Sequence, residues 1–495
     1  MKRIIGLTVI GCVMLSLIGC GKPAAPAASE SSLSVAAEGE TTLRETDAEN
    51  EMAVPEETAE SETAGLEEAS KSYSLETIRN EICGADAMVA LDDGTFVTAI
   101  NFDNAATTPA LKAVNDEVVE KLATYAYTGQ GKGQKSAAVT AFFEEARETV
   151  LDFVDADPEL YTAFFCSNTT DGLNKLSSAL VTDEDDMVLT SRMEHYANDL
   201  PWRNRGNTIY AEVDENGRLV LDEMERMLEE YPVKYVSITA ASNVTGYIND
   251  VHALARMAHE HGALIIVDGA QIVPHRAFSV MGETPEENID FFVFSAHKMY
   301  APYGGGAVVG LKSELDAHIP RFYGAGIVEE VTDESEKYLS SPSLYEAGSL
   351  NYTGVVAMCK AIDILERIGY DKIEAQEQAY LRKIIDGLQA IDGVTVYGDT
   401  DNISDKIGIV TFNIDDVPYT EVASALANTA GIDVGKGTFG AQPYVFRLLG
   451  IPNSDDVEEE ESADMPGMVR ISMGIYNTEE EIDILLDTVR SIAEK

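Results

Sequence analysis

A chain of 495 residues is longer than one hydrophobic core normally supports, so we expect two domains and an appendage. Apolar residues make up 45% of the sequence, which is enough for a large globular core. The 86 acidic and 35 basic residues give a net charge of −51, which repels nucleic acid and anionic lipid headgroups. We therefore expect no nucleic-acid partner.

The first twenty residues predict an export signal. Lys2 and Arg3 precede the apolar run Ile4–Ile18, which is short for a membrane span. The segment Leu17–Cys20 resembles the lipobox of bacterial lipoproteins, which implies that Cys20 is acylated. We expect an extracytoplasmic protein that is held at the bacterial cell membrane by its lipid alone. An uncleaved apolar anchor is the alternative.

The remaining chain divides into three further parts. Residues 21–72 are rich in Ala, Ser, Thr, Pro and Glu and poor in aromatic residues, which predicts a disordered acidic tether. Globular patterning begins near Tyr73. We expect a large domain over residues 101–350 and a small domain composed of residues 73–100 and 351–495.

Short apolar runs alternate with helical patterns in the large domain. This order predicts a mainly parallel sheet of the seven-stranded type, covered by helices on both faces, with its ligand at the carboxyl ends of the strands. The strands are expected at Val236–Thr239, Ala263–Val267 and Phe291–Phe294, and the helices at Leu221–Tyr231 and Val251–His261.

The C-terminal part predicts a smaller α+β domain. A helix is expected at Gly354–Ile368, and strands are expected near Ile407–Asn413 and Met468–Ser472. The fold class is therefore α/β, with a large sheet domain and a smaller second domain.

Two polar features follow apolar strands and indicate a ligand site. The hydroxyl-rich segment Ser167–Gly172 leads into a helix, and a helix N-terminus attracts phosphate, although ordinary Ser/Thr capping is the commoner explanation of such a turn. Asp268 ends an apolar strand, where it could pair with a protonated ring nitrogen such as that of pyridoxal phosphate (PLP) or could cap the next helix.

Lys298 follows the strand at Phe291–Phe294. A lysine at the end of a buried strand loses its proton readily and becomes able to form an imine. Asp268 and Lys298 are separated by one β-α-β crossover, so we expect both side chains at one edge of the sheet.

Seven ordered motifs between about residue 80 and residue 495 resemble the class V aminotransferase family, and specifically its cysteine-desulfurase branch. This family has the fold type I of PLP-dependent enzymes. The motifs are Asn101–Ala106, Met193–Asn198, Ser242–Gly246, Val267–Gln271, Ser295–Lys298, Tyr345–Ser349 and Arg470–Met473.

The resemblance implies that PLP is the cofactor and that Lys298 holds it as a Schiff base and moves the α-proton of the substrate. His195 would stack on the cofactor ring, Asp268 would pair with the ring nitrogen and Gln271 would bind the ring hydroxyl. Asn243 would lie beside both the ring and the substrate.

The resemblance also implies the contacts of the phosphate and of the substrate. Arg470 would clamp the carboxylate of a small amino acid through a bidentate pair. The phosphate would be held by Thr169, Thr170, Ser295 and His297, and by Ser349 from the second subunit of a homodimer.

The sequence departs from the family in the loop that carries the desulfurase nucleophile. Alignment of this loop places Gly440 where a cysteine belongs, and Gly435 and Lys436 stand near the place of an expected arginine. Cys166 and Cys359 are interpreted as packed core thiols. We therefore expect no persulfide on this chain.

Three functions are compatible with these features. We expect a PLP-dependent transaminase or lyase that acts on a small amino acid through an external aldimine. The alternatives are a cysteine desulfurase with an external thiol acceptor and a non-catalytic protein that binds PLP or an amino acid. No metal site is expected.

Overall fold

The computed structural model describes residues 72–128, 133–451 and 465–495. The predicted export signal, the lipidated Cys20 and the predicted tether up to residue 71 lie outside the described residues. In the described part of the chain, no helix combines the length and the apolar character that crossing a bilayer requires.

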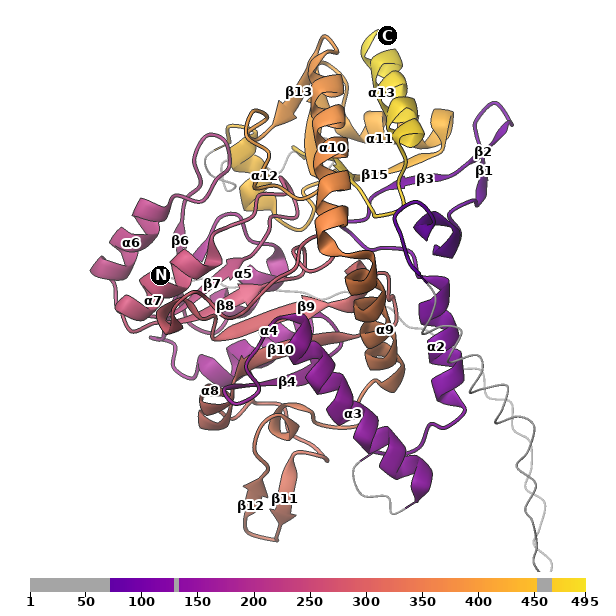
Figure 1. The fold of residues 1–495 in the computed structure, drawn as a ribbon. Coiled ribbons are helices and arrows are strands. Elements are labelled where there is room, and N and C mark those ends of the chain that lie inside the picture. Colours follow the sequence, from indigo (N-terminus) through magenta and orange to yellow (C-terminus); the bar gives the residue numbers. More distant parts are fainter. Residues whose placement is uncertain (1–71, 129–132, 452–464) are drawn as a thin grey trace, which may run out of the picture. The chain divides into compact units, whose positions relative to one another are not determined.

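A seven-stranded sheet forms the centre of the large domain (Figure 1), as the alternation of strands and helices predicted. Its strands run parallel except β10, which is antiparallel to both of its neighbours. In spatial order the strands are β4 (Tyr161–Cys166), β10 (Gly306–Leu311), β9 (Phe291–Ser295), β8 (Leu264–Asp268), β7 (Val233–Thr239), β5 (Met187–Ser191) and β6 (Asn207–Ala211).

Both faces of this sheet are buried, which explains why its strands are continuously apolar. Successive side chains point to opposite faces, so Phe164 and Ile266 pack on one face while Phe165 and Ile265 pack on the other. The first face is covered by α4 (Thr169–Leu180), α5 (Tyr196–Arg203) and α8 (Lys312–Ala317). The second is covered by α2 (Lys112–Leu122), α3 (Gln134–Phe153), α6 (Leu221–Glu230), α7 (Val251–Glu260) and α9 (Tyr352–Ile368).

A five-stranded sheet forms the second domain. The N-terminal strand β3 joins it in parallel with β15, and the other pairs are antiparallel, so this sheet contains segments from both ends of the described chain. Its order is β13 (Val394–Tyr397), β14 (Ile409–Ile414), β16 (Met468–Ser472), β15 (Ile432–Gly437) and β3 (Ile100–Phe102). The residue boundaries drawn for the two domains stay a prediction.

The helices α10 (Tyr370–Gln389), α11 (Tyr419–Ala430) and α13 (Glu479–Ala493) pack on this second sheet. A short helix, α12 (Gln442–Leu448), follows β15 and packs against a separate apolar cluster. β14 begins two residues later than predicted because Ile407 donates its backbone N–H to the carbonyl of Gly246 rather than to a strand.

Two hairpins extend from these domains (Figure 1). They consist of β1 (Met88–Ala90) with β2 (Phe96–Thr98), and of β11 (Val328–Val331) with β12 (Glu336–Tyr338).

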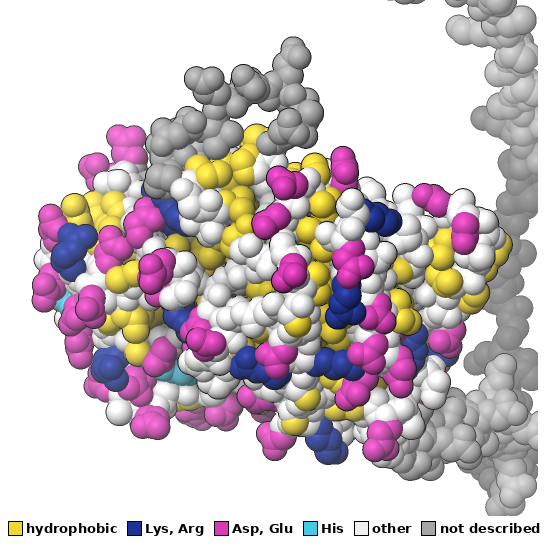
Figure 2. Space-filling view, turned by 90° about the horizontal axis from the view of Figure 1, so that it is seen from above, with side chains coloured by type: hydrophobic (Ala, Val, Ile, Leu, Met, Phe, Trp, Pro, Cys, Tyr) yellow, Lys and Arg dark blue, Asp and Glu magenta, His cyan; other side chains and the backbone are white. Residues whose placement is uncertain are grey.

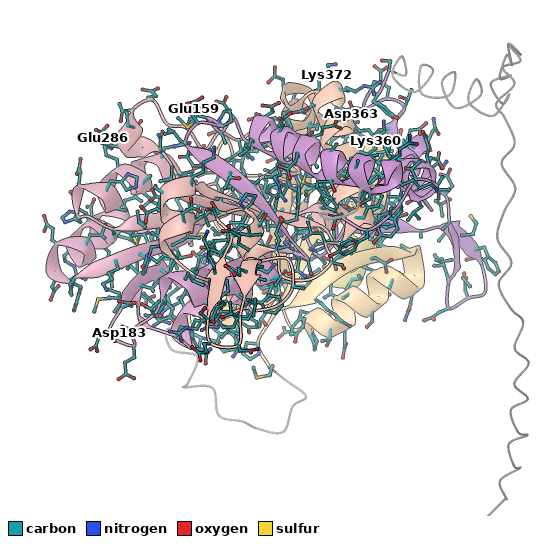
Figure 3. The ribbon with its side chains drawn as sticks, turned by 90° about the horizontal axis from the view of Figure 1, so that it is seen from below. Glu159, Asp183, Glu286, Lys360, Asp363 and Lys372 are labelled. Atoms are coloured by element: carbon teal, nitrogen blue, oxygen red, sulfur yellow. The ribbon has the colours of Figure 1, made fainter. Side chains whose placement is uncertain are left out.

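The acidic side chains of the described residues are spread over the face shown in Figure 2. Figure 2 shows Asp and Glu side chains scattered over the face that it presents, with Lys and Arg side chains between them. Glu159, Asp183 and Glu286 lie at the periphery in Figure 3. On the face seen in Figure 2, the acidic side chains of the described residues are therefore distributed and do not form one acidic patch.

Candidate active site

The carboxyl ends of three neighbouring parallel strands meet at one edge of the large sheet. β7 ends at Thr239, β8 at Asp268 and β9 at Ser295. A cavity of about 460 Å³ opens at this edge. The predicted side chains that line it are Thr169, Thr170, His195, Asn243, Asp268, Gln271, Ser295, His297, Lys298 and Arg470.

Lys298 and Asp268 lie in this one cavity, where each changes the ionisation of the other. Burial lowers the pKa of Lys298 to about 8, the negative charge of Asp268 opposes this shift, and the positive charge of Arg470 adds to it. Burial raises the pKa of Asp268, while the N–H of Ala270 and the charge of Lys298 oppose the rise. Lys298 is therefore a primary amine that loses its proton more readily than an ordinary lysine, as imine formation requires.

His195 presents a neutral ring to the cavity. It precedes α5, and its Nδ1 accepts the backbone N–H of Ala197 at 3.1 Å, which fixes the orientation of the imidazole. Burial lowers the pKa of His195 to about 4, and the charges of Lys298 and Arg470 contribute to the same shift. An uncharged, oriented ring is suited to stacking on a flat aromatic ligand.

The turn before α4 is organised in a way that leaves Thr170 available. Asn168 caps the helix by accepting the backbone N–H of Asp171 at 2.9 Å. Thr169 is engaged with Ser295, because its N–H donates to the Ser295 hydroxyl at 2.7 Å. Thr170 is exposed to the cavity at a helix N-terminus, where an anion is stabilised.

Asn243 and Gln271 occupy the cavity wall. Asn243 donates its side-chain N–H to the backbone carbonyl of Phe439 at 2.8 Å. Gln271 donates to the carbonyl of Ala105 at 2.9 Å, whereas its own buried Oε1 has no hydrogen-bond partner among the described residues. That oxygen is an acceptor for a ligand hydroxyl.

Arg470 projects from β16 and is only 4% exposed. Its Nη2 donates to Oδ1 of Asp103 at 2.6 Å and its Nη1 donates to the carbonyl of Asn243 at 2.9 Å. The ring of Phe439 lies 4.7 Å from the guanidinium carbon. Burial lowers the pKa of Arg470, and the carboxylate of Asp103 partly offsets this effect.

Gly440, at the position aligned with the desulfurase nucleophile, lies against His195. The carbonyl of Gly440 accepts the N–H of Tyr196 at 2.7 Å, which attaches this segment to the start of α5. A Cβ atom at position 440 would lie 2.5 Å from Nε2 of His195, and the φ angle is +71°. A side chain at position 440 would therefore require His195 to shift and would adopt an unfavourable backbone conformation, and the glycine itself supplies no nucleophile.

The cysteines of the described chain do not line the cavity. Burial raises the pKa of Cys166 to about 12 and that of Cys359 to about 12, so neither is a reactive thiol, as their interpretation as packed core residues requires. Cys83 borders a neighbouring cavity of about 450 Å³ that shares Asp103 with the first.

Ser349 is exposed and does not line the cavity of its own chain. Its segment is held in place by Glu346, which pairs with Arg147 at 2.7 Å and accepts the backbone N–H of Phe165 at 2.7 Å. Its predicted contact with the phosphate of a second subunit stays a prediction.

Sequence reasoning missed several side chains of the site, among them Asp103, Asn168 and Phe439. Asp103 and Asn168 lie inside motifs that we quoted, but their spacing indicated no role. Phe439 precedes Gly440 and has a φ angle of +53°, which nothing in the sequence indicates for a phenylalanine. No group of His, Cys, Asp and Glu in the described segments is arranged to hold a metal ion.

The model of the aminotransferase class-V family matches residues 100–485. The chain belongs to the class-V aminotransferase family. Members of this family are PLP-dependent enzymes, so this class-V aminotransferase homologue is a PLP-dependent enzyme with the type I fold. The alternative of a non-catalytic binding protein is not supported.

The most informative relatives are named cysteine desulfurases. One from Haloferax volcanii is 32% identical over 412 residues, which cover 81% of this chain and 91% of that protein. A probable cysteine desulfurase from Halalkalibacterium halodurans is 32% identical over 396 residues, or 78% of this chain and 91% of that protein.

Solved structures show the same likeness. The apo cysteine desulfurase of Thermococcus onnurineus NA1 superposes with a TM-score of 0.75 at 27% identity, covering 86% of this chain and 99% of that one. The Escherichia coli cysteine desulfurase CsdA has a TM-score of 0.70 at 24% identity and supports the fold alone. These comparisons favour the desulfurase alternative over the transaminase or lyase that we expected first.

The residues of the cavity fit PLP. Lys298 would supply the amine and Asp268 would supply a carboxylate for the ring nitrogen. Oε1 of Gln271, which has no hydrogen-bond partner among the described residues, would suit a ring hydroxyl. The open N-terminus of α4 at Thr170 suits the phosphate.

Proposed function

We propose that this enzyme removes the sulfur of cysteine, or of a close analogue, and transfers it to a thiol that comes from outside its cavity. The observation that carries the proposal is the placement of Lys298 and Asp268 in one cavity with Arg470. The names of the relatives support cysteine as the substrate, and the glycine at position 440 supports an external acceptor.

Each residue has a task that follows from its surroundings. PLP, once bound, withdraws electrons from the α-carbon of an attached amino acid. The amine of Lys298, with its lowered pKa, can take the α-proton and return it. Asp268 would keep the ring nitrogen protonated, His195 would cover one face of the ring, and Arg470 would orient the substrate carboxylate.

The reaction is balanced without an oxidant. Cysteine and a thiol R–SH yield alanine and the persulfide R–S–SH, so one C–S bond breaks, one S–S bond forms and the thiol proton ends on the carbon skeleton. A second thiol then releases sulfide from the persulfide and leaves a disulfide.

Gly440 also favours a second candidate function, which is β-elimination. Without a nucleophile beside the substrate sulfur, cysteine can lose hydrogen sulfide directly as its C–S bond breaks, and hydrolysis of the remaining enamine by one water yields pyruvate and ammonia. The two reactions differ in their carbon product, because only desulfuration gives alanine.

The test uses the purified, PLP-loaded protein with cysteine and dithiothreitol, and measures sulfide, alanine and pyruvate. We expect wild type to produce sulfide and alanine. In Lys298→Ala, both products and the visible absorption of the bound cofactor should be lost. The exposed Lys372 of α10, labelled in Figure 3, provides the matched control Lys372→Ala, which should behave as wild type. Pyruvate without alanine would support elimination, and an unchanged spectrum in Lys298→Ala would contradict the assignment of the lysine.

The thiol Cys83 needs its own control, because it borders the neighbouring cavity. With an external acceptor, Cys83→Ser should leave the rate of sulfide release and its dependence on dithiothreitol unchanged. A protein-bound persulfide that disappears in Cys83→Ser would show that the acceptor belongs to the chain.

We further propose that the protein is lipid-anchored outside the cytoplasmic membrane. The proposal is supported by Lys2, Arg3, the apolar run and the lipobox-like Leu17–Cys20. In the native host, Cys20→Ala should move the protein from the membrane fraction to the soluble fraction and abolish the incorporation of labelled fatty acid. The anchor would be contradicted if the Cys20→Ala variant fractionated like wild type and wild type incorporated no labelled fatty acid.

We also propose a homodimer in which Ser349 reaches the phosphate of the partner. The support is that Ser349 lies exposed outside the cavity of its own chain, on a segment fixed by Glu346. Sedimentation should show that wild type is a dimer. Ser349→Ala should weaken PLP binding while the protein remains a dimer. The proposal would be refuted if wild type sedimented as a monomer, or if Ser349→Ala bound PLP as tightly as wild type.

A further inference from the structure

One edge of the Arg470 guanidinium is only half satisfied. Nε and Nη2 lie on the same edge, which is the edge that a carboxylate grips with two parallel hydrogen bonds. Nη2 donates to Asp103 at 2.6 Å, whereas the buried Nε has no hydrogen-bond partner among the described residues. Nη1 is taken by the carbonyl of Asn243. The Nε–Nη2 edge is therefore the part of Arg470 that can receive a second carboxylate.

Asp103 is placed so that it can leave this edge. Its side chain is 31% exposed, whereas that of Arg470 is only 4% exposed, so the aspartate is the partner that solvent can accommodate. It also lines both the site and the neighbouring cavity, which gives its carboxylate a place to turn to.

Gly435 leaves space beside the same edge. A Cβ atom at position 435 would lie 2.8 Å from Oδ1 of Asp103 and 3.1 Å from Nε of Arg470. Gly435 pairs with Arg470 across β15 and β16 and lines the cavity. The lack of a side chain there keeps the edge from being filled.

We propose that Asp103 occupies, in the free enzyme, the position that a substrate carboxylate takes on Arg470, and that this competition sets the affinity for the substrate. The inference rests on the proposed role of Arg470 as the carboxylate contact. Two carboxylates cannot share Nη2 at full strength, and their like charges repel in a buried site. A ligand carboxylate must therefore displace Asp103, and its affinity is lowered by the hydrogen bond that it breaks.

The test measures the binding of propionate to the PLP-loaded enzyme by titration calorimetry, because propionate has a carboxylate but no amine to react. Asp103→Asn keeps an acceptor of similar shape and removes the competing charge. We expect propionate to bind about tenfold more tightly to Asp103→Asn than to wild type. This change in affinity is the size expected when one charge-assisted hydrogen bond no longer competes with the ligand. Asp103→Ser should show the same direction, and fluorescence of Trp202 confirms that each variant is folded.

Two further variants make the result specific. Asp222→Asn removes one negative charge from an exposed position of α6 that lines neither cavity, and should leave propionate binding unchanged. Gly435→Ala should fill the space beside the edge and weaken propionate binding about tenfold or more.

The outcomes separate this inference from the proposed function. Unchanged or weaker binding in both Asp103 variants would overturn the inference. If Arg470→Gln still binds propionate like wild type, the carboxylate contact itself is wrong and both proposals fail at that residue. Loss of binding in Arg470→Gln together with no gain in Asp103→Asn would overturn only the role of Asp103.

Discussion

Replacing Gly440 by cysteine restores the residue type of a desulfurase nucleophile, yet we expect it to damage this enzyme. The φ angle of +71° makes any side chain at position 440 unfavourable by about 1–2 kcal/mol. The added Cβ would lie 2.5 Å from Nε2 of His195, and overpacking of this kind costs about 1–3 kcal/mol more. The free energy of unfolding should therefore fall by about 2–5 kcal/mol.

Gly450 provides a matched control for Gly440→Cys. Its φ angle is +76°, but a Cβ atom there meets no atom of the described residues within 4 Å. Gly450→Cys should therefore lose only the backbone contribution of about 1–2 kcal/mol. The difference between the two variants isolates the contact with His195.

The assay is urea unfolding of the apoenzyme, followed by fluorescence. The chain contains one tryptophan, and Trp202 lies fully buried in α5, the helix that begins after His195. The fluorescence of Trp202 therefore reports on α5, the helix next to the His195 ring that a side chain at position 440 would displace. Equal unfolding midpoints for Gly440→Cys and Gly450→Cys would refute the packing of this loop on His195, and a persulfide on Gly440→Cys would do so as well.

Three further predictions concern the ionisable groups of the site. Because the pKa of Lys298 is lowered to about 8, stopped-flow capture of PLP by the apoenzyme should accelerate from pH 7 to 9 and then level off; a continued rise toward pH 10.5 would indicate an ordinary lysine. Asp268→Asn should retain PLP but lose about 10²-fold in kcat, and a normal kcat would contradict its pairing with the ring nitrogen. Burial raises the pKa of Glu194 to about 8, against hydrogen bonds from Ser191 and Asn198, so the folded state holds an extra proton between about pH 4.5 and 8. Urea unfolding should show wild type losing stability across this range relative to Glu194→Gln, and parallel pH profiles would refute the shift.

Much of the site could be predicted because consecutive β-α-β units place successive strand ends at one edge. Asp268 and Ser295 end adjacent parallel strands, and Lys298 follows in the next turn, so their neighbourhood is a consequence of local order along the chain. The same logic located the turn before α4. The alternative of Ser/Thr capping was right that the turn is capped but wrong in the residue type, because Asn168 caps the helix while Thr170 faces the cavity.

The sequence by itself determined the parallel sheet and the chemical types gathered at its edge, because these follow from periodicity and strand ends. The lack of a nucleophile at position 440 followed from the resemblance to the family. Only the tertiary structure decided which groups touch. Asp103 meets Arg470 across 367 positions of sequence, and Gly440 lies against His195 from a different domain. Such contacts depend on how the second sheet packs against the first. A local sequence pattern does not encode the distance between two side chains on different elements.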